Sequence, residues 1–368
     1  MLLADVQLLC CVDCRAELRL QSYQLRDTVI EDGMLVCTAC NRAYPIVDQV
    51  GIFFRRHVLS DYLTEPEMAR IRANGHAAAL ESSASPDEGH ARQLAACKNW
   101  EYQWLETLPF GVEDLSGGGW SGPEAFWNFI PIDPAAVEGK IVFASCVGRG
   151  REVYHLSKAK PARIIANEIG SEIYAVRELV RGMDHQLLLL RSDVTYLPLK
   201  EQICDVAICD HALQHVFDHQ RAFATLAGVT RSAGLIGICV YSREHNWIMT
   251  GVVEPAKRLL RHVPLTVLQK LAFAPGLALY CAIHFFYVPL SKLAPAAARR
   301  LPLHDQMLFW YGNSFKVLWQ CCFDFLHAPI SHHFTRAEME ALATENGLEI
   351  LRLTNTHSTT WSLVAQRA

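Results

Sequence analysis

Four cysteines near the N-terminus have the spacing of a metal site. Cys11 and Cys14 form one C-x-x-C pair, and Cys37 and Cys40 form a second. Each pair places two thiolates on one tight turn, and two such turns brought together give a tetrahedral sulfur site for zinc. Because cysteine fills all four positions, no place is open to water, and the metal would be structural. A redox pair is the alternative, and the adjacent Cys10 leaves a second ligand register open.

A second group of residues has the pattern of a nucleotide site. The apolar run at 141–144 is followed by Gly148 and Gly150 and then by a helical segment, and the next apolar run leads to Glu168. A backbone that turns sharply from strand to helix beside a ligand needs glycine. An acid at the tip of the next strand suits the diol of a ribose.

The later elements separate two cofactor families that share these features. A third strand at 187–190 is followed by Asp193, a fourth at 204–209 ends at Asp210, and a fifth spans 235–241. This order resembles the seven-stranded S-adenosylmethionine-dependent methyltransferases, in particular the type 11 group, over residues 140 to 242. Nicotinamide oxidoreductases share the glycines and the acid but not the later pattern.

The resemblance implies a cofactor site at the carboxyl ends of these strands. It implies that Glu168 binds the ribose hydroxyls and that Asp193 binds the adenine amino group. The residues to which it assigns cofactor binding are Ser145, Cys146, Gly148, Gly150, Glu168, Ile169, Asp193, Val194 and Asp210.

The first strand departs from the family pattern. Where the family has an acid that holds the amino group of the cofactor, this chain has Ala144, and where a glycine follows two positions later it has Cys146. A noncatalytic binding partner that keeps the fold and uses the zinc ribbon for protein contact is therefore the alternative function.

Catalysis needs alignment of the acceptor with an already activated methyl group, and in some cases a base. By analogy with the family, the candidates are His215, Asp210 and His211, which follow the fourth strand. His332 and His333, before the last helix, are further candidates. A lone histidine at such a junction also serves as a structural hydrogen-bonding residue.

An apolar insertion separates the fifth strand from the last helix. Residues 271–290 carry no formal charge over a length that could cross a bilayer. We expect a helical lid whose residues Leu277, Tyr280, Phe285 and Phe286 include some that line an apolar acceptor pocket. Flanking basic residues also permit peripheral membrane contact through 271–290.

Composition narrows the class of partner. The chain has 368 residues, 34 Lys and Arg against 38 Asp and Glu, and a net charge of −4. No basic excess points to nucleic acid, so none is expected as a partner. The N-terminus lacks the pattern of a signal peptide, and a cytoplasmic location is the default expectation.

The sequence thus predicts an α/β protein with a seven-stranded, doubly wound, Rossmann-like methyltransferase sheet, an N-terminal zinc ribbon and a helical insertion. The expected divisions are a ribbon at 1–57, a linker and cap helices at 58–135, and a methyltransferase domain at 136–368 with the insertion at 246–330. The cofactors would be S-adenosylmethionine and a structural zinc. The acceptor would be a small molecule, lipophilic or glycan-linked.

Overall fold

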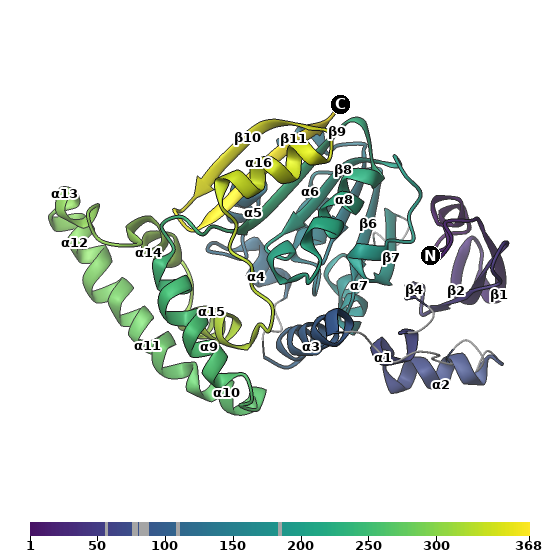
Figure 1. Cartoon of the computed structure of the whole chain (residues 1–368), viewed down its shortest axis with the longest axis horizontal. Coiled ribbons are helices and arrows are strands. Elements are labelled where there is room, and N and C mark those ends of the chain that lie inside the picture. The colour runs from purple at the N-terminus through teal and green to yellow at the C-terminus, as the bar shows by residue number, and fades with distance from the viewer. Residues whose placement is uncertain (56–57, 76–79, 81–87, 108–110, 183–185) are drawn as a thin grey trace.

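The computed structural model describes residues 1–55, 58–75, 80, 88–107, 111–182 and 186–368 (Figure 1). The linker expected around residues 81–87 lies outside the described residues.

Within these described ranges, eleven strands form one continuous sheet in the order β1-β2-β3-β4-β7-β6-β5-β8-β9-β11-β10. The seven strands from β7 to β10 make up the predicted methyltransferase sheet, in which β11 runs antiparallel to β9 and to β10. Their bounds are β5 Ile141–Ser145, β6 Arg163–Glu168, β7 Leu187–Ser192, β8 Cys204–Asp210, β9 Thr230–Tyr241, β10 Leu348–Thr356 and β11 Thr360–Arg367.

Helices cover both faces of this sheet because successive side chains of a strand point to opposite faces. In β5, Phe143 packs on the face covered by α8 (His219–Val229) and α16 (Arg336–Glu345). Its neighbour Val142 packs on the other face, against helices α5 Pro123–Phe129, α6 Arg151–Lys158 and α7 Val176–Leu179. Every residue of β6 and β7 is buried, as expected for parallel strands covered on both faces.

The seven expected strands are present, and the strands of the predicted zinc ribbon extend the same sheet. The ribbon strands are β1 Leu18–Arg26, β2 Val29–Cys37, β3 Ala43–Val47 and β4 Val50–Phe53. Strand β4 pairs in parallel with β7, with Gly51 opposite Leu190 and Phe53 opposite Ser192. Both strands would otherwise leave an edge of unpaired backbone groups, and the pairing satisfies both.

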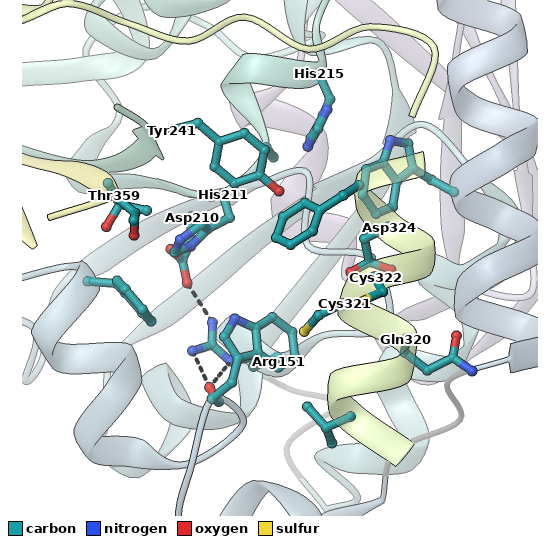
Figure 2. Close-up of a pocket in the computed structure, with 18 of the residues that line it drawn as sticks. Arg151, Asp210, His211, His215, Tyr241, Gln320, Cys321, Cys322, Asp324 and Thr359 are labelled. Carbon is teal, nitrogen blue, oxygen red and sulfur yellow. Dashed lines mark hydrogen bonds and ion pairs between the residues drawn. The ribbon is translucent and has the colours of Figure 1, made fainter. Parts of the chain in front are cut away.

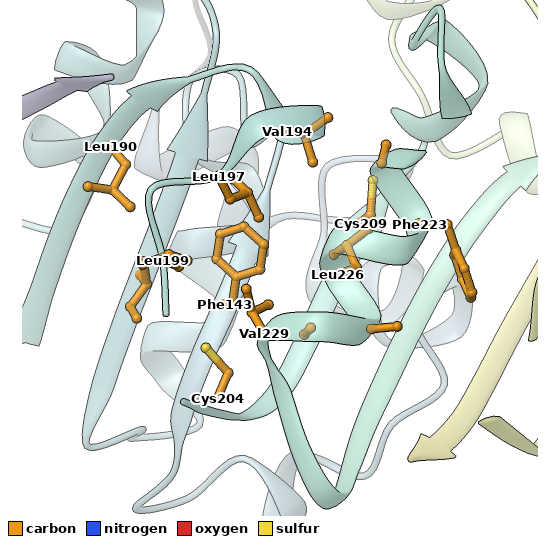
Figure 3. Close-up of a cluster of buried hydrophobic side chains, with 14 of the residues drawn as sticks. Phe143, Leu190, Val194, Leu197, Leu199, Cys204, Cys209, Phe223, Leu226 and Val229 are labelled. Carbon is orange, nitrogen blue, oxygen red and sulfur yellow. The ribbon is translucent and has the colours of Figure 1, made fainter. Parts of the chain in front are cut away.

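The ribbon and the sheet also share a hydrophobic core. One cluster joins ribbon residues such as Leu35 and Tyr44 to Phe143, Leu190 and Leu199 of the methyltransferase sheet. Figure 3 shows the sheet side of this cluster, where Phe143 lies between the strands and the residues of α8. The two parts therefore bury apolar surface in common.

Four helices follow the ribbon, and the third of them, with the residues after it, forms the cap. They are α1 Leu59–Tyr62, α2 Glu65–Ala73, α3 Glu88–Tyr102 and α4 Val112–Ser116. The buried side chain of Arg191, at the end of β7, forms an ion pair with Glu67 of α2 and donates to the carbonyl oxygen of Tyr62. This buried pair fixes α2 over the edge where ribbon and sheet meet.

The insertion, here called the helical arm (residues 246–330), projects from the sheet at the end opposite the ribbon (Figure 1). Its helices are α9 Glu254–Leu260, α10 Leu265–Leu271, α11 Phe273–Ala282, α12 Val288–Leu293, α13 Pro295–Ala298, α14 His304–Trp310 and α15 Phe315–His327. Helix α11 packs closely on α15, since a Cβ at Gly276 would lie 2.8 Å from Cα of Trp319. Phe285 and Phe286 are 75% and 52% exposed.

Candidate functional site

The glycine turn after β5 is held by a carboxylate from β6. Gly148 and Gly150 have φ angles of +50° and +98°, and Cys146 has +55°. The backbone N–H of Gly148 donates to Oε2 of Glu168 at 2.7 Å, and the N–H of Ile169 donates to Oε1 at 2.7 Å. A side chain at Gly148 would approach the indole of Trp104 to 3.0 Å. The glycine therefore allows the cap to close on the turn.

A cavity of about 440 Å³ lies beyond the carboxyl ends of β5, β6 and β8. This is where ligands bind in open α/β sheets. Its lining is mostly apolar and comes from the sheet tips, from Trp100 and Trp104 of the cap, and from the helical arm. The arm contributes Ile248, Met249, Val253, Pro275, Leu279, Leu303, Gln306, Met307, Phe309, Trp310, Val317, Gln320, Cys321, Cys322, Asp324 and Phe325.

The structure brings five of the predicted cofactor residues to this cavity, namely Cys146, Gly148, Glu168, Ile169 and Asp210. Ser145 is buried at the end of β5 and does not line it. Gly150 immediately precedes α6 and packs against Val176, so its contribution is to the turn and not to the wall.

Asp193 and Val194 lie elsewhere. Val194 is buried in the core under α8. Asp193 lines a neighbouring cavity, and its Oδ1 accepts from the N–H and the hydroxyl of Thr195 at 2.8 and 2.7 Å. Gln93 of α3 lines both cavities, so they adjoin at this side chain. The adenine role of Asp193 remains a prediction, and it requires a ligand that extends past Gln93.

Two carboxyl groups that the sequence did not reveal also line the cavity. Glu152, in the first turn of α6, is buried, and burial raises its pKa to about 7. Glu172 is 1% exposed, and its Oε2 has no hydrogen-bond partner among the described residues. Both occur near the glycine turn, where Ala144 leaves the acid of the family pattern absent. A position in the first turn of a helix after a glycine turn is the signal that would have pointed to Glu152.

Arg151 and Asp210 form a buried ion pair on the cavity floor. The guanidinium Nη1 lies 2.5 Å from Oδ2 of Asp210, and two other guanidinium nitrogens donate to the carbonyl oxygen of Trp120 (Figure 2). Oδ1 of Asp210 lies 2.7 Å from Nδ1 of His211. Burial raises the pKa of Asp210, but His211 and Arg151 outweigh it and lower the pKa below its usual value. Asp210 is therefore an anion that holds its neighbours and not a free base.

The pKa values of the two predicted catalytic histidines are shifted in opposite directions. Burial disfavours a charge on His211, yet Cys239 and Asp210 raise its pKa to about 10. Burial lowers the pKa of His215 to about 3. His215 Nδ1 lies 2.7 Å from the carbonyl oxygen of Ile330, while its Nε2 has no partner among the described residues. Thus His211 is a cation at neutral pH, and His215 is neutral with a lone pair available at Nε2.

Tyr241 and Asp324 are polar cavity residues that sequence reasoning missed. They come from β9 and α15, and Figure 2 shows both beside the cavity with His215 and Arg151. Burial raises the pKa of Asp324 to about 8, and its Oδ1 has no hydrogen-bond partner among the described residues. The available signal was a single acid in the mostly apolar helix 315–327.

The lid expectation holds only in part. Leu277, Tyr280, Phe285 and Phe286 lie on the helical arm, but none of them lines the cavity. Pro275 and Leu279 of α11 do. The reason is that α11 turns one face to α15 and the cavity, while Phe285 and Phe286 lie on the solvent side.

The four predicted ligand sulfurs converge in the ribbon. Atoms of Cys11, Cys14, Cys37 and Cys40 all lie within 4.8 Å of one another. The Cys11 and Cys40 sulfurs are 3.6 Å apart, and those of Cys14 and Cys37 are 3.4 Å apart. Ligands about 2.3 Å from a tetrahedral zinc lie about 3.8 Å from one another, so the set fits this metal.

Contacts around the cysteine sulfurs support the same choice of ligands. The Tyr44 hydroxyl lies 3.0 Å from the Cys11 sulfur, and the N–H of Cys40 donates to the Cys37 sulfur at 3.4 Å. Such contacts orient metal ligands. Cys10 is not part of the cluster, which confirms the choice of Cys11.

Comparisons with known proteins agree with both parts of the chain. Residues 144–238 match the methyltransferase-domain family, and residues 6–48 match the Trm112p-like protein family. Residues 144–238 of the chain are therefore similar to a methyltransferase domain. They are preceded by a Trm112p-like zinc ribbon. Both matches agree with the expected cofactors, S-adenosylmethionine for the sheet and a structural zinc for the four cysteines.

Solved structures with similar folds share little sequence with the chain. A complex from Haloferax volcanii between the Trm112 methyltransferase activator and a protein described as a methyltransferase has 12% identity and a TM-score of 0.43, covering 77% of this chain and 99% of that one. The Burkholderia thailandensis 1,6-didemethyltoxoflavin-N1-methyltransferase has 11% identity and a TM-score of 0.42, covering 78% and 93%. An S-adenosylmethionine-dependent methyltransferase from Mesorhizobium loti has 13% identity and a TM-score of 0.42, and the match covers 67% of this chain and 98% of that one. No curated protein matches the sequence.

Proposed function

We propose that the protein is an active methyltransferase that transfers the methyl group of S-adenosylmethionine to a small acceptor with a largely apolar body. The observation that carries this proposal is the single cavity in which the glycine turn, Glu168 and an apolar wall from the helical arm come together. S-adenosylmethionine supplies an electrophilic methyl group on a sulfonium when bound.

The charges of the cavity suit this cofactor. Around the glycine turn, its lining contains the carboxyl groups of Glu152, Glu168 and Glu172. The cations of the lining, Arg151 and His211, both pair with Asp210. Opposite charges nearby stabilise a cationic ligand, most strongly where water is excluded. Glu168 would hold the ribose diol, and Glu152 or Glu172 would receive the ammonium group that the family acid binds.

The acceptor would lie between the sheet tips and the arm. Its apolar part would contact side chains such as Leu279, Met307 and Trp310, and its reacting atom would point to Nε2 of His215. That nitrogen accepts the proton that an oxygen or nitrogen acceptor loses when its lone pair forms the bond to the methyl carbon. Burial lowers the pKa of His215, so its Nε2 carries no proton before the reaction. The same burial makes the ring a weak base, which suits an oxygen acceptor because that oxygen becomes strongly acidic as it bonds to the methyl carbon.

Cofactor binding tests the proposal against the noncatalytic alternative. We expect wild-type protein to bind S-adenosylmethionine and S-adenosylhomocysteine in calorimetric titrations. Glu168→Ala should weaken binding about tenfold or more, because a charge-assisted hydrogen bond contributes about 1.5 to 3 kcal/mol. Glu178→Ala, at an exposed acid of α7, is the matched control and should bind as the wild type does.

Wild-type protein without affinity for either molecule would favour the noncatalytic partner. Equal affinities of wild type and Glu168→Ala would remove Glu168 from the site. Transfer of labelled methyl groups from S-adenosylmethionine into the organic extract of cells that lack the gene then tests activity.

A further inference from the structure

The helical arm exposes an apolar stripe along its longest helical stretch. Residues Leu265–Leu293 form 29 residues of nearly continuous helix, the one stretch of the described chain that is long and apolar enough to cross a membrane. Only 22% of its most apolar window is buried in protein. Phe273, Leu277 and Phe286 are among its exposed side chains. Six further exposed positions recur at helical intervals of three, four, seven or eight residues: Val267, Leu271, Ala274, Ala278, Phe285 and Leu293. This spacing places them on one face.

The opposite face of the same stretch is already occupied. Leu268, Ala272, Gly276, Ile283 and Val288 are buried, and they pack against α14 and α15. A helix that crosses a bilayer alone exposes all its sides to lipid, so a span would require this stretch to leave α15 and open the cavity wall. A helix that keeps its packing presents its apolar stripe parallel to a surface.

The charge of the arm indicates what that surface is. Residues 246–330 contain eight Lys and Arg and three Asp and Glu, a net charge of +5, although the whole chain carries −4. Seven of these basic residues are exposed: Arg258, Arg261, Lys270, Lys292, Arg299, Arg300 and Lys316. None of the seven pairs with a carboxylate in the described part of the chain.

The acidic residues of the arm do not offset this surface charge. Glu254 pairs with Lys257 at 2.7 Å, and Asp324 faces the cavity. Asp305 is the one exposed acid. Lys270 lies near the start of the apolar stripe, and Lys292 lies near its end. Cations that flank an apolar helix face bind anionic headgroups while the apolar side chains enter the acyl boundary.

We propose that the helical arm docks on the surface of an anionic lipid membrane, with α10 to α12 lying in the plane of the interface. The same helices supply Pro275 and Leu279 to the cavity wall. Docking therefore places the cavity next to the lipid phase, where an acceptor with an apolar body partitions. The membrane contact itself does not depend on methyl transfer.

Vesicle flotation tests this inference with the full chain and needs neither cofactor nor acceptor. We expect the protein to float with vesicles of phosphatidylcholine and phosphatidylglycerol, to bind pure phosphatidylcholine vesicles less, and to lose binding as salt rises. The double variant Phe285→Ser and Phe286→Ser should weaken binding to the anionic vesicles about tenfold or more. Arg299→Glu with Arg300→Glu should weaken it by a similar factor.

The matched control is Leu351→Ser with Arg352→Glu, an exposed apolar and basic pair on β10 away from the arm, which should float as the wild type does. Wild-type protein that stays below the vesicles overturns the proposal, as does a control that loses as much binding as the arm variants. If light scattering shows that the wild type is a dimer and that the Phe285 and Phe286 variant is a monomer, the stripe is instead an interface with a second copy of the chain. If the vesicles protect the segment from protease as they protect a membrane-crossing helix, the stretch is a transmembrane span.

Discussion

His215 is the residue whose surroundings best fit a base, because one ring nitrogen is held and the other is free. Nδ1 bonds to Ile330, and the indole of Trp100 lies against the ring with centroids 4.7 Å apart. His211 cannot take the same role at neutral pH, since Asp210 and Cys239 keep it protonated. The two histidines are four residues apart, and their environments separate their functions.

Replacing His215 with asparagine should therefore lower methyl transfer and leave cofactor binding intact. We expect a loss of about 100-fold in the rate of labelled methyl transfer into the organic extract, within the usual range for a general base. Calorimetry should give an unchanged affinity for S-adenosylhomocysteine. His262→Asn, at an exposed position of the arm, is the control. An unchanged transfer rate in His215→Asn would show that alignment alone suffices.

The raised pKa of Asp324 predicts that the protein becomes less stable as pH rises. Its pKa is about 8 in the folded protein against 3.8 ordinarily, because burial penalises the carboxylate. Between these two pKa values the folded state keeps a proton that the unfolded state releases. The resulting contribution of Asp324 to the free energy of unfolding is fully present below the unfolded pKa. It is lost as pH rises through the folded pKa.

Asp324→Asn removes the ionisation and should flatten this dependence. Between about pH 5 and about pH 8, the wild type should lose up to about 1.4 kcal/mol per pH unit more than the variant in the free energy of unfolding. Denaturant titrations at several pH values measure the difference. Parallel curves for the two proteins would show that Asp324 is ionised throughout this range.

At the scale of elements, the pairing of β4 with β7 makes the metal site part of the main sheet. The cysteine turns hold the ribbon strands, and the ribbon core continues into the cluster around Phe143. Loss of zinc should therefore lower the stability of the whole protein and not of the ribbon alone.

Cys37→Ser tests this coupling. Zinc content should fall from one ion per chain toward zero, and the melting temperature of the whole protein should fall by at least several degrees in a single transition. Cys10→Ser should retain zinc because the Cys10 sulfur is outside the cluster. An early ribbon transition followed by an unchanged main transition would contradict the coupling, and a metal content near zero in the wild type would end the zinc assignment.

At the scale of the whole molecule, the ribbon extends the seven-stranded sheet at one end only. The ribbon covers the free edge of β7, and the antiparallel pair β11 and β10 forms the other end. The helical arm extends the molecule beyond that second end (Figure 1). Ligand cavity, metal site and proposed membrane surface are thus carried by one continuous sheet with its attached helices.

Removal of residues 1–55 would uncover β7 and the apolar residues beneath the ribbon. An exposed, flat edge of this kind pairs with other chains. We expect the truncated protein to be insoluble or to elute as oligomers in size-exclusion chromatography, whereas the full chain elutes as a defined species. A truncated monomer that binds S-adenosylhomocysteine with full affinity would show that the ribbon is separable.

Local features were predictable from the sequence wherever residue spacing alone specifies a turn or a ligand set. Two C-x-x-C pairs predicted the zinc ligands, and the glycines with Glu168 predicted the turn after the first strand of the nucleotide site. The order of the later strands followed from the resemblance to the methyltransferase family. These signals are readable because the chemistry depends on residues close together in the chain. The helical character of the insertion was equally local, since length and apolar content are enough to predict it.

How the ribbon, the sheet and the helical arm meet could not be predicted from local patterns. The parallel pairing of Gly51 with Leu190 joins segments far apart in the chain, and no local pattern specifies such a partner. Glu152, Glu172, Tyr241 and Asp324 gather at the cavity because separate strands and helices converge there. The sequence also did not show which residues of α11 are buried and which are exposed. An apolar helix with no polar side lacks the pattern that would distinguish them, and the packing against α15 fixes the buried face.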